Sequence, residues 1–138
     1  MQRIKAKHHM STTEKITLNL SVVDLGKIDL LVEEGFYTNR TDFMRSAIKQ
    51  SLVHHSSDTE SAMERQRVLG VGVCVYSKSD LERIVSEGKQ LTVNFLGLMV
   101  FDKDVPPELA VKAVASVRVK GVFRATVSVK KALRDKIL

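Results

Sequence analysis

The sequence predicts an α+β protein in two parts, and two patterns lead to that prediction. The first is a short run of alternating apolar and polar residues over 15–20, which two helical patterns follow. The second is a glycine-containing apolar run that recurs after residue 67, each time before a helical pattern. A polar, serine-containing stretch over 54–66 separates the two parts, and we expect a linker and a domain boundary there.

The composition fits a small folded protein that binds a polyanion. The chain has 138 residues, an apolar content of 43% and a formal net charge of +6. This apolar content is sufficient for a core, and the positive charge favours nucleic acid as a partner. The single cysteine, Cys74, cannot form an intrachain disulfide. We therefore expect a reduced, cytoplasmic setting. No apolar run is long enough to span a membrane, so we expect no membrane partner.

Residues 1–13 are polar and show no periodicity, which predicts a flexible arm. Two interpretations stay open. The arm is a solvated tail, or its basic residues Arg3, Lys5 and Lys7 contact nucleic-acid phosphates and add affinity that is independent of base sequence.

The alternating run at 15–20 predicts a strand with one buried face. Its apolar residues are Ile16, Leu18 and Leu20, and its polar residues are Lys15, Thr17 and Asn19. A strand this short is unstable alone, and no other strand-like run precedes residue 67. We therefore expect it to pair with the same strand of a second chain. A two-stranded ribbon fits the major groove of DNA with its polar side chains facing the base edges.

Two helices are predicted after the strand. The first begins at Ser21, which forms a capping-box pattern with Asp24, and it ends before Gly35. The second begins at Asn39, a good N-cap residue, with Asp42 at the third helical position. The apolar residues expected to be buried are Leu25, Ile28, Leu31 and Val32 in the first helix, and Phe43, Met44, Ala47, Ile48 and Leu52 in the second. The free amides after Asn39 could also hold a phosphate.

This arrangement resembles a ribbon-helix-helix domain of the CopG/Arc/MetJ type. The matching features are the alternating strand, the short gap before the first helix, Gly35 between the helices, and the segment YTNRTDFMRSAI at residues 37–48. The resemblance covers residues 15–52, and we place the domain at 14–53. It implies an intertwined homodimer that binds double-stranded DNA through an antiparallel ribbon. The expected function is sequence-specific transcriptional regulation, as a repressor.

The resemblance also assigns roles to individual residues. Lys15, Thr17 and Asn19 read bases, and Asn39 and Arg40 bind the phosphate backbone. This chemistry is reasonable, because Asn pairs with adenine, Lys donates to guanine and the Thr methyl group contacts the thymine methyl. The alternative for the three strand residues is an ordinary solvated face. Net charge does not separate these interpretations, because residues 15–52 contain Lys15, Lys27, Arg40, Arg45 and Lys49 against Asp24, Asp29, Glu33, Glu34 and Asp42.

The second part, residues 67–138, predicts about three β–α units. Gly72, Gly97 and Gly121 each lie in an apolar strand-like run and recur about every 25 residues. The helical patterns that follow span residues 79–87, 106–114 and 127–137. Such units form a small parallel β/α array or a compact sheet covered by helices. The glycines mark a bend or a close backbone approach, or they leave room for a ligand. We expect this domain to serve oligomerisation, to tetramers or larger, or effector sensing.

The sequence does not predict an enzyme, a cofactor or a metal site. His54, His55 and Cys74 lack the spacing of a metal site, and no catalytic motif is present. Two alternatives to a regulator stay open. The protein is an antitoxin of a toxin–antitoxin pair whose C-terminal half binds the toxin, or it is a DNA-anchored module for protein interaction and assembly.

Overall fold

The computed structural model describes residues 11–138. The basic residues predicted for the arm, Arg3, Lys5 and Lys7, lie outside this range. The chain divides into two compact units. One is Lys15–Gln66, and the other is Arg67–Leu138 together with the segment that ends at Glu14. No helix within the described range is long and apolar enough to cross a membrane.

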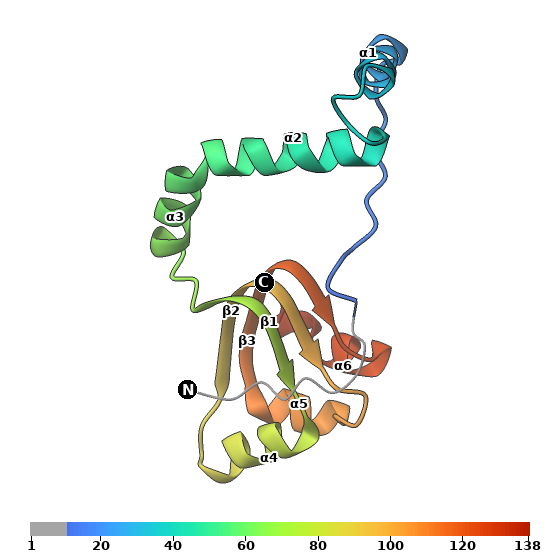
Figure 1. Ribbon diagram of the computed structural model, residues 1–138. Helices are drawn as coiled ribbons and strands as arrows, with labels where there is room; N and C mark the ends of the chain where they lie inside the picture. Colours follow the sequence, from blue (N-terminus) through green and yellow to red (C-terminus); the bar gives the residue numbers. More distant parts are fainter. Residues whose placement is uncertain (1–10) are drawn as a thin grey trace. The chain divides into compact units, whose positions relative to one another are not determined.

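The unit Lys15–Gln66 contains α1 (Val22–Glu33), α2 (Arg40–His54) and α3 (Ser56–Arg65) (Figure 1). The predicted boundaries of the first helix are confirmed. The Ser21 hydroxyl accepts a hydrogen bond from the Asp24 amide at 3.1 Å. After α1, Gly35 adopts a φ of 83°, and the Phe36 amide donates to the Leu31 carbonyl at 3.0 Å. This is the left-handed helix stop that a glycine accepts without steric cost.

The predicted strand at residues 15–20 does not form in the single chain. The apolar side chains stay open to solvent, with Ile16 85% exposed and Leu18 64% exposed. A strand is stabilised only when a neighbouring strand takes up its backbone hydrogen bonds, and no described segment of the same chain supplies one. The ribbon and its dimer therefore stay predictions that need a second copy of the chain.

The apolar residues of the two helices that were expected to be buried are only partly so. Ile28 in α1 is buried, but α2 contains no buried residue. Ile48 and Leu52, which were expected in the core, are 58% and 62% exposed. Two helices packed against each other enclose too little volume to bury both of their apolar faces, so these side chains stay largely exposed within the described part of the chain.

The stretch 54–66 is not the irregular linker that its composition predicts. Most of it forms α3, in which the Thr59 hydroxyl donates to the His55 carbonyl at 2.9 Å. The stretch contains neither glycine nor proline, so nothing in it breaks a helix. Asp58 in the first turn and Arg65 in the last turn also complement the helix dipole. The division between the two units falls after Gln66.

The other unit, which we call the sheet unit, contains three β–α pairs in chain order, as the repeats predicted. They are β1 (Gly70–Tyr76) with α4 (Lys78–Ser86), β2 (Leu91–Phe101) with α5 (Pro107–Ala113), and β3 (Val114–Arg124) with α6 (Val127–Ala132). The strands form a parallel sheet in the order β1-β2-β3 (Figure 1). The third helix is shorter than expected, because α6 ends at Ala132 and a 3₁₀ turn, η1 (Arg134–Lys136), follows it.

The core of this unit lies on one face of the sheet. The strand residues in it alternate along the chain, and the buried ones include Val93, Met99, Phe101 and Val117. The helices contribute Leu81, Ala110, Ala113 and Val129, and Leu133 follows directly after α6. Each helix therefore covers the same side of the sheet, and no helix among the described residues of this unit packs on the opposite side.

The repeated glycines lie side by side across the sheet. Gly72 pairs with Gly97, and Gly97 pairs with Gly121. Their φ values are 120°, 128° and 119°, a region that side-chain-bearing residues rarely adopt. A Cβ atom on Gly97 would overlap the carbonyl oxygen of Gly72, and one on Gly121 would overlap the carbonyl oxygen of Gly97. The expectation of close backbone approach at these glycines is therefore confirmed.

Candidate nucleic-acid interface

The three residues predicted to read bases lie on an extended and open segment. Lys15, Thr17 and Asn19 are all exposed. They precede the N-cap of α1, Ser21, which fixes where the helix begins. The single chain therefore leaves these side chains accessible, and it does not bring them together with those of a second strand.

Asn39, which was predicted to bind phosphate, has a structural role at the start of α2. Its Oδ1 atom accepts a hydrogen bond from the Asp42 amide at 2.8 Å. Asp42 Oδ2 also accepts a hydrogen bond from the Thr38 amide at 3.0 Å. Together the two bonds fix the first turn of α2. The Asn39 side-chain nitrogen is not used by the cap.

Arg40 is held by an acidic residue that sequence reasoning did not single out. Its Nε atom donates to Asp29 Oδ1 at 2.7 Å, and its Nη2 atom donates to Asp29 Oδ2 at 2.8 Å. The hydrogen bonds from Arg40 lower the pKa of Asp29, and those same bonds raise the pKa of Arg40. Both side chains are exposed to solvent. A guanidinium has five N–H donors, so the pair leaves donors of Arg40 free to bind a phosphate.

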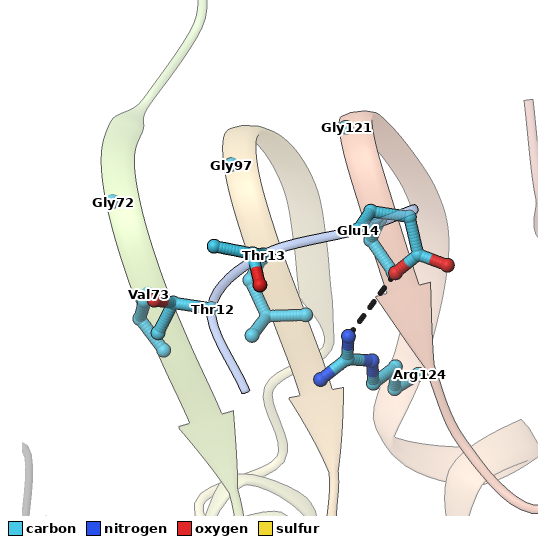
Figure 2. Close-up of a pocket in the computed structure, with 10 residues that line it drawn as sticks. Thr12, Thr13, Glu14, Gly72, Val73, Gly97, Gly121 and Arg124 are labelled. Atoms are coloured by element: carbon cyan, nitrogen blue, oxygen red, sulfur yellow. Dashed lines mark hydrogen bonds and ion pairs between the residues drawn. The ribbon is translucent and has the colours of Figure 1, made fainter. Parts of the chain in front are cut away.

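The other unit contains a groove on the sheet face that has no helix. Thr12, Thr13 and Glu14 cross the three strands beside the row of glycines (Figure 2). The groove has a volume of about 380 Å³. Its walls also include Val73, Leu98, Val122 and Arg124. No sequence pattern indicates this contact, because it joins a polar N-terminal segment to the end of the last strand.

Arg124 binds the crossing segment at two points. Its Nη1 atom donates to the Ser11 carbonyl at 2.6 Å, and its Nη2 atom donates to Glu14 Oε2 at 3.1 Å. Figure 2 shows the second of these as a dashed line. Residues 11–13, which were predicted as part of a flexible arm, are therefore in contact with the sheet.

The residues considered as metal ligands are not brought together into a cluster. The ring of His54 lies against that of His55, with 4.9 Å between their centroids. Cys74 is half-buried in the sheet unit, and burial raises the pKa of its thiol. No group of three or more His, Cys, Asp or Glu residues in the part of the chain that the structure describes could hold a metal ion.

The first unit, with its glycine-stopped helix, capped second helix and exposed alternating segment, has the features of a small DNA-binding domain. A family model described as the ribbon-helix-helix transcriptional regulator family matches residues 11–130. The chain therefore belongs to this family, and membership indicates a DNA-binding transcriptional regulator rather than an enzyme. The match extends beyond residues 15–52 into the parallel-sheet unit. No match was found among curated proteins or among solved structures.

Proposed function

We propose that the protein is a homodimeric, sequence-specific transcriptional repressor whose two N-terminal strands pair and read the major groove. The observation that supports this best is the exposed apolar surface of the unit Lys15–Gln66. Ile16 and Leu18 on the extended segment and Ile48 and Leu52 on α2 are all more than half exposed. Apolar side chains in this number on so small a unit favour a partner that covers them.

A second copy of the same unit would supply both a strand to pair with residues 15–20 and a surface to cover the exposed apolar side chains. Its strand would take up the unpaired backbone groups of residues 15–20, and its helices would cover the apolar face of α2. An antiparallel pair of identical strands is compatible with two-fold symmetry, in which the same surface serves both subunits. The paired strands would place Ile16, Leu18 and Leu20 of both chains on the inner face.

Pairing would also define the surface that contacts DNA. Because side chains alternate along a strand, Lys15, Thr17 and Asn19 would then share the outer face and point to the base edges. Asn39, through its side-chain nitrogen, and Arg40, through its free donors, would contact the phosphates on either side of the groove. These contacts would set the register of the ribbon on the duplex.

The sheet unit is then the part that serves oligomerisation or effector sensing. The antitoxin alternative has less support, because toxin-binding segments are commonly disordered until bound. Residues 67–138 instead enclose a core of their own.

Binding of the purified protein to the DNA upstream of its own gene tests the proposal. The assay uses two salt concentrations and a scrambled duplex as competitor, and light scattering gives the oligomeric state. We expect an even number of subunits and binding that survives the competitor. A monomer would contradict the proposed dimer. Binding that the scrambled duplex removes equally would contradict sequence-specific recognition, because only sequence-blind phosphate attraction would then remain.

A further inference from the structure

Residues 11–14, which we call the strap, lie on the sheet face that no helix of the unit covers. Within the strap, the Ser11 hydroxyl donates to the Thr13 carbonyl at 3.2 Å, so the segment has local order of its own. Thr12, Thr13 and Glu14 cross the three strands beside Gly72, Gly97 and Gly121 (Figure 2). The same three glycines and residues 12–14 line one groove.

Apolar residues of this face are buried although none of the described helices covers it. Parallel sheets are normally covered on both faces. Leu98 and Val100 alternate with the core residues of β2 and so belong to the face away from the helices, yet they are only 6% and 8% exposed. Leu98 forms part of the wall beneath the strap.

Arg124 holds the strap at both ends, through the Ser11 carbonyl and the Glu14 carboxylate. Its side chain is only 34% exposed, which reduces screening of the ion pair by water. One guanidinium thus binds two points of the same short segment. Such a contact orders a segment more than a single surface ion pair does, because both donors are fixed in one plane.

The place of the strap in the chain gives it a consequence for DNA binding. Glu14 directly precedes Lys15, the first of the residues proposed to read bases. The unit Lys15–Gln66 is therefore attached to the sheet unit at both of its ends, by the strap before it and by the continuous chain at Arg67 after it. A strand whose preceding residue is already held loses less conformational freedom when it binds DNA.

We propose that the strap, held by Arg124, is an anchor that orders the start of the DNA-reading strand. Loss of the contact between Arg124 and the strap would therefore weaken operator binding. This inference rests on the function proposed above and adds a regulatory connection between the two units. Anything that displaces Glu14 from Arg124 would act on DNA binding without touching the reading residues.

The test compares Arg124→Gln with Arg118→Gln in the full chain. Arg118 is an exposed residue of the same strand, and by the alternation of β3 it lies on the same face, so both variants lose the same charge there. The rate of hydrogen exchange of the amides of residues 11–20, in the absence of DNA, measures how firmly the strap is held. The affinity for the operator measures whether the strap affects DNA binding.

We expect faster exchange in Arg124→Gln and an operator affinity lower by about fivefold than that of Arg118→Gln. Glu14→Gln removes the carboxylate from an exposed position that cannot unfold the sheet, and it should accelerate exchange in the same way. Equal exchange in Arg124→Gln and Arg118→Gln would overturn the anchor. Faster exchange with equal operator affinity would overturn the coupling to DNA.

These outcomes are separable from failure of the proposed function. If the wild-type protein shows no preference for its operator, the proposed function and the coupling both fail. The exchange comparison still decides whether Arg124 anchors the strap, because it needs no DNA.

Discussion

Arg40, at the start of α2, forms a two-point ion pair with Asp29 of α1, with N–O distances of 2.7 and 2.8 Å. The pair joins the two helices through a residue that we also propose to contact DNA. The ion pair fixes the direction of the Arg40 side chain. The negative charge of Asp29 offsets part of the positive charge with which Arg40 would attract a phosphate. Arg40 thus has a structural and a proposed functional role at the same position.

Stability of the unit Lys15–Gln66 should fall in acid through Asp29. The hydrogen bonds from Arg40 hold the pKa of Asp29 below its ordinary value of 3.8. A carboxylate with a lowered folded-state pKa stabilises the fold above its unfolded pKa, and this contribution is lost as the pH falls through the folded pKa. Asp29→Asn should therefore be less stable than wild type at neutral pH and similar to it below that pKa, by urea unfolding. Glu33→Gln on the same helix is the control, and a similar pH dependence of its stability difference would contradict the assignment.

Arg40→Gln should weaken DNA binding equally on operator and scrambled duplexes, because a phosphate contact carries no base information. The slope of log affinity against log salt should become shallower by about 1. Fluorescence anisotropy over a salt series measures both quantities. An unchanged slope would remove Arg40 from the phosphate contacts and leave it only the ion pair with Asp29.

Substitutions of Asn39 should separate its cap from its proposed contact with DNA. Asn39→Ala removes the acceptor for the Asp42 amide and should destabilise the unit by about 1 kcal/mol. Asn39→Asp keeps an acceptor at this position but adds a negative charge facing the phosphates. We expect near-normal thermal stability and weaker DNA binding for Asn39→Asp. Normal DNA binding by that variant would show that Asn39 acts as a cap alone.

Asn19→Ala should lower the affinity for the operator by about 1–3 kcal/mol without changing the fold, since an exposed side chain ahead of α1 supports no core. Binding to the scrambled duplex should stay as in wild type. Competition assays with both duplexes make the measurement, and circular dichroism checks the fold. Equal weakening on both duplexes would assign Asn19 to the backbone rather than to bases.

Gly97→Ala should destabilise the sheet unit by about 1–3 kcal/mol or more, because alanine disfavours its φ of 128° and the new Cβ meets the Gly72 carbonyl. Gly72→Ala has the same backbone strain at φ 120° but open space around the Cβ, so it should cost less. Gly26→Ala, inside α1 with nothing nearby, should instead stabilise the chain. Urea unfolding of the three variants gives the order, and equal costs for Gly97 and Gly72 would refute the proposed overlap.

Local patterns in the sequence predicted the helices and the repeats. Ser21, Gly35 and Asn39 mark helix ends because caps and left-handed stops depend on a few neighbouring residues. The recurring glycines predicted the strands of the sheet unit, since each repeat has the same conformational requirement. The ribbon-helix-helix resemblance was confirmed by the family match over residues 11–130. The base and phosphate contacts stay predictions.

Tertiary structure decided what depends on residues far apart in the chain. Only the fold brings Arg124 to Ser11 and Glu14, because their contact spans more than a hundred positions of polar and apolar sequence with no local pattern. The same holds for Arg40 and Asp29, whose charges were visible but whose pairing depends on how α1 packs against α2. The strand predicted at residues 15–20 does not form in the single chain. Its alternation is a property of the sequence, but no described segment of the chain supplies its hydrogen-bond partners, and pairing with a second copy stays a prediction.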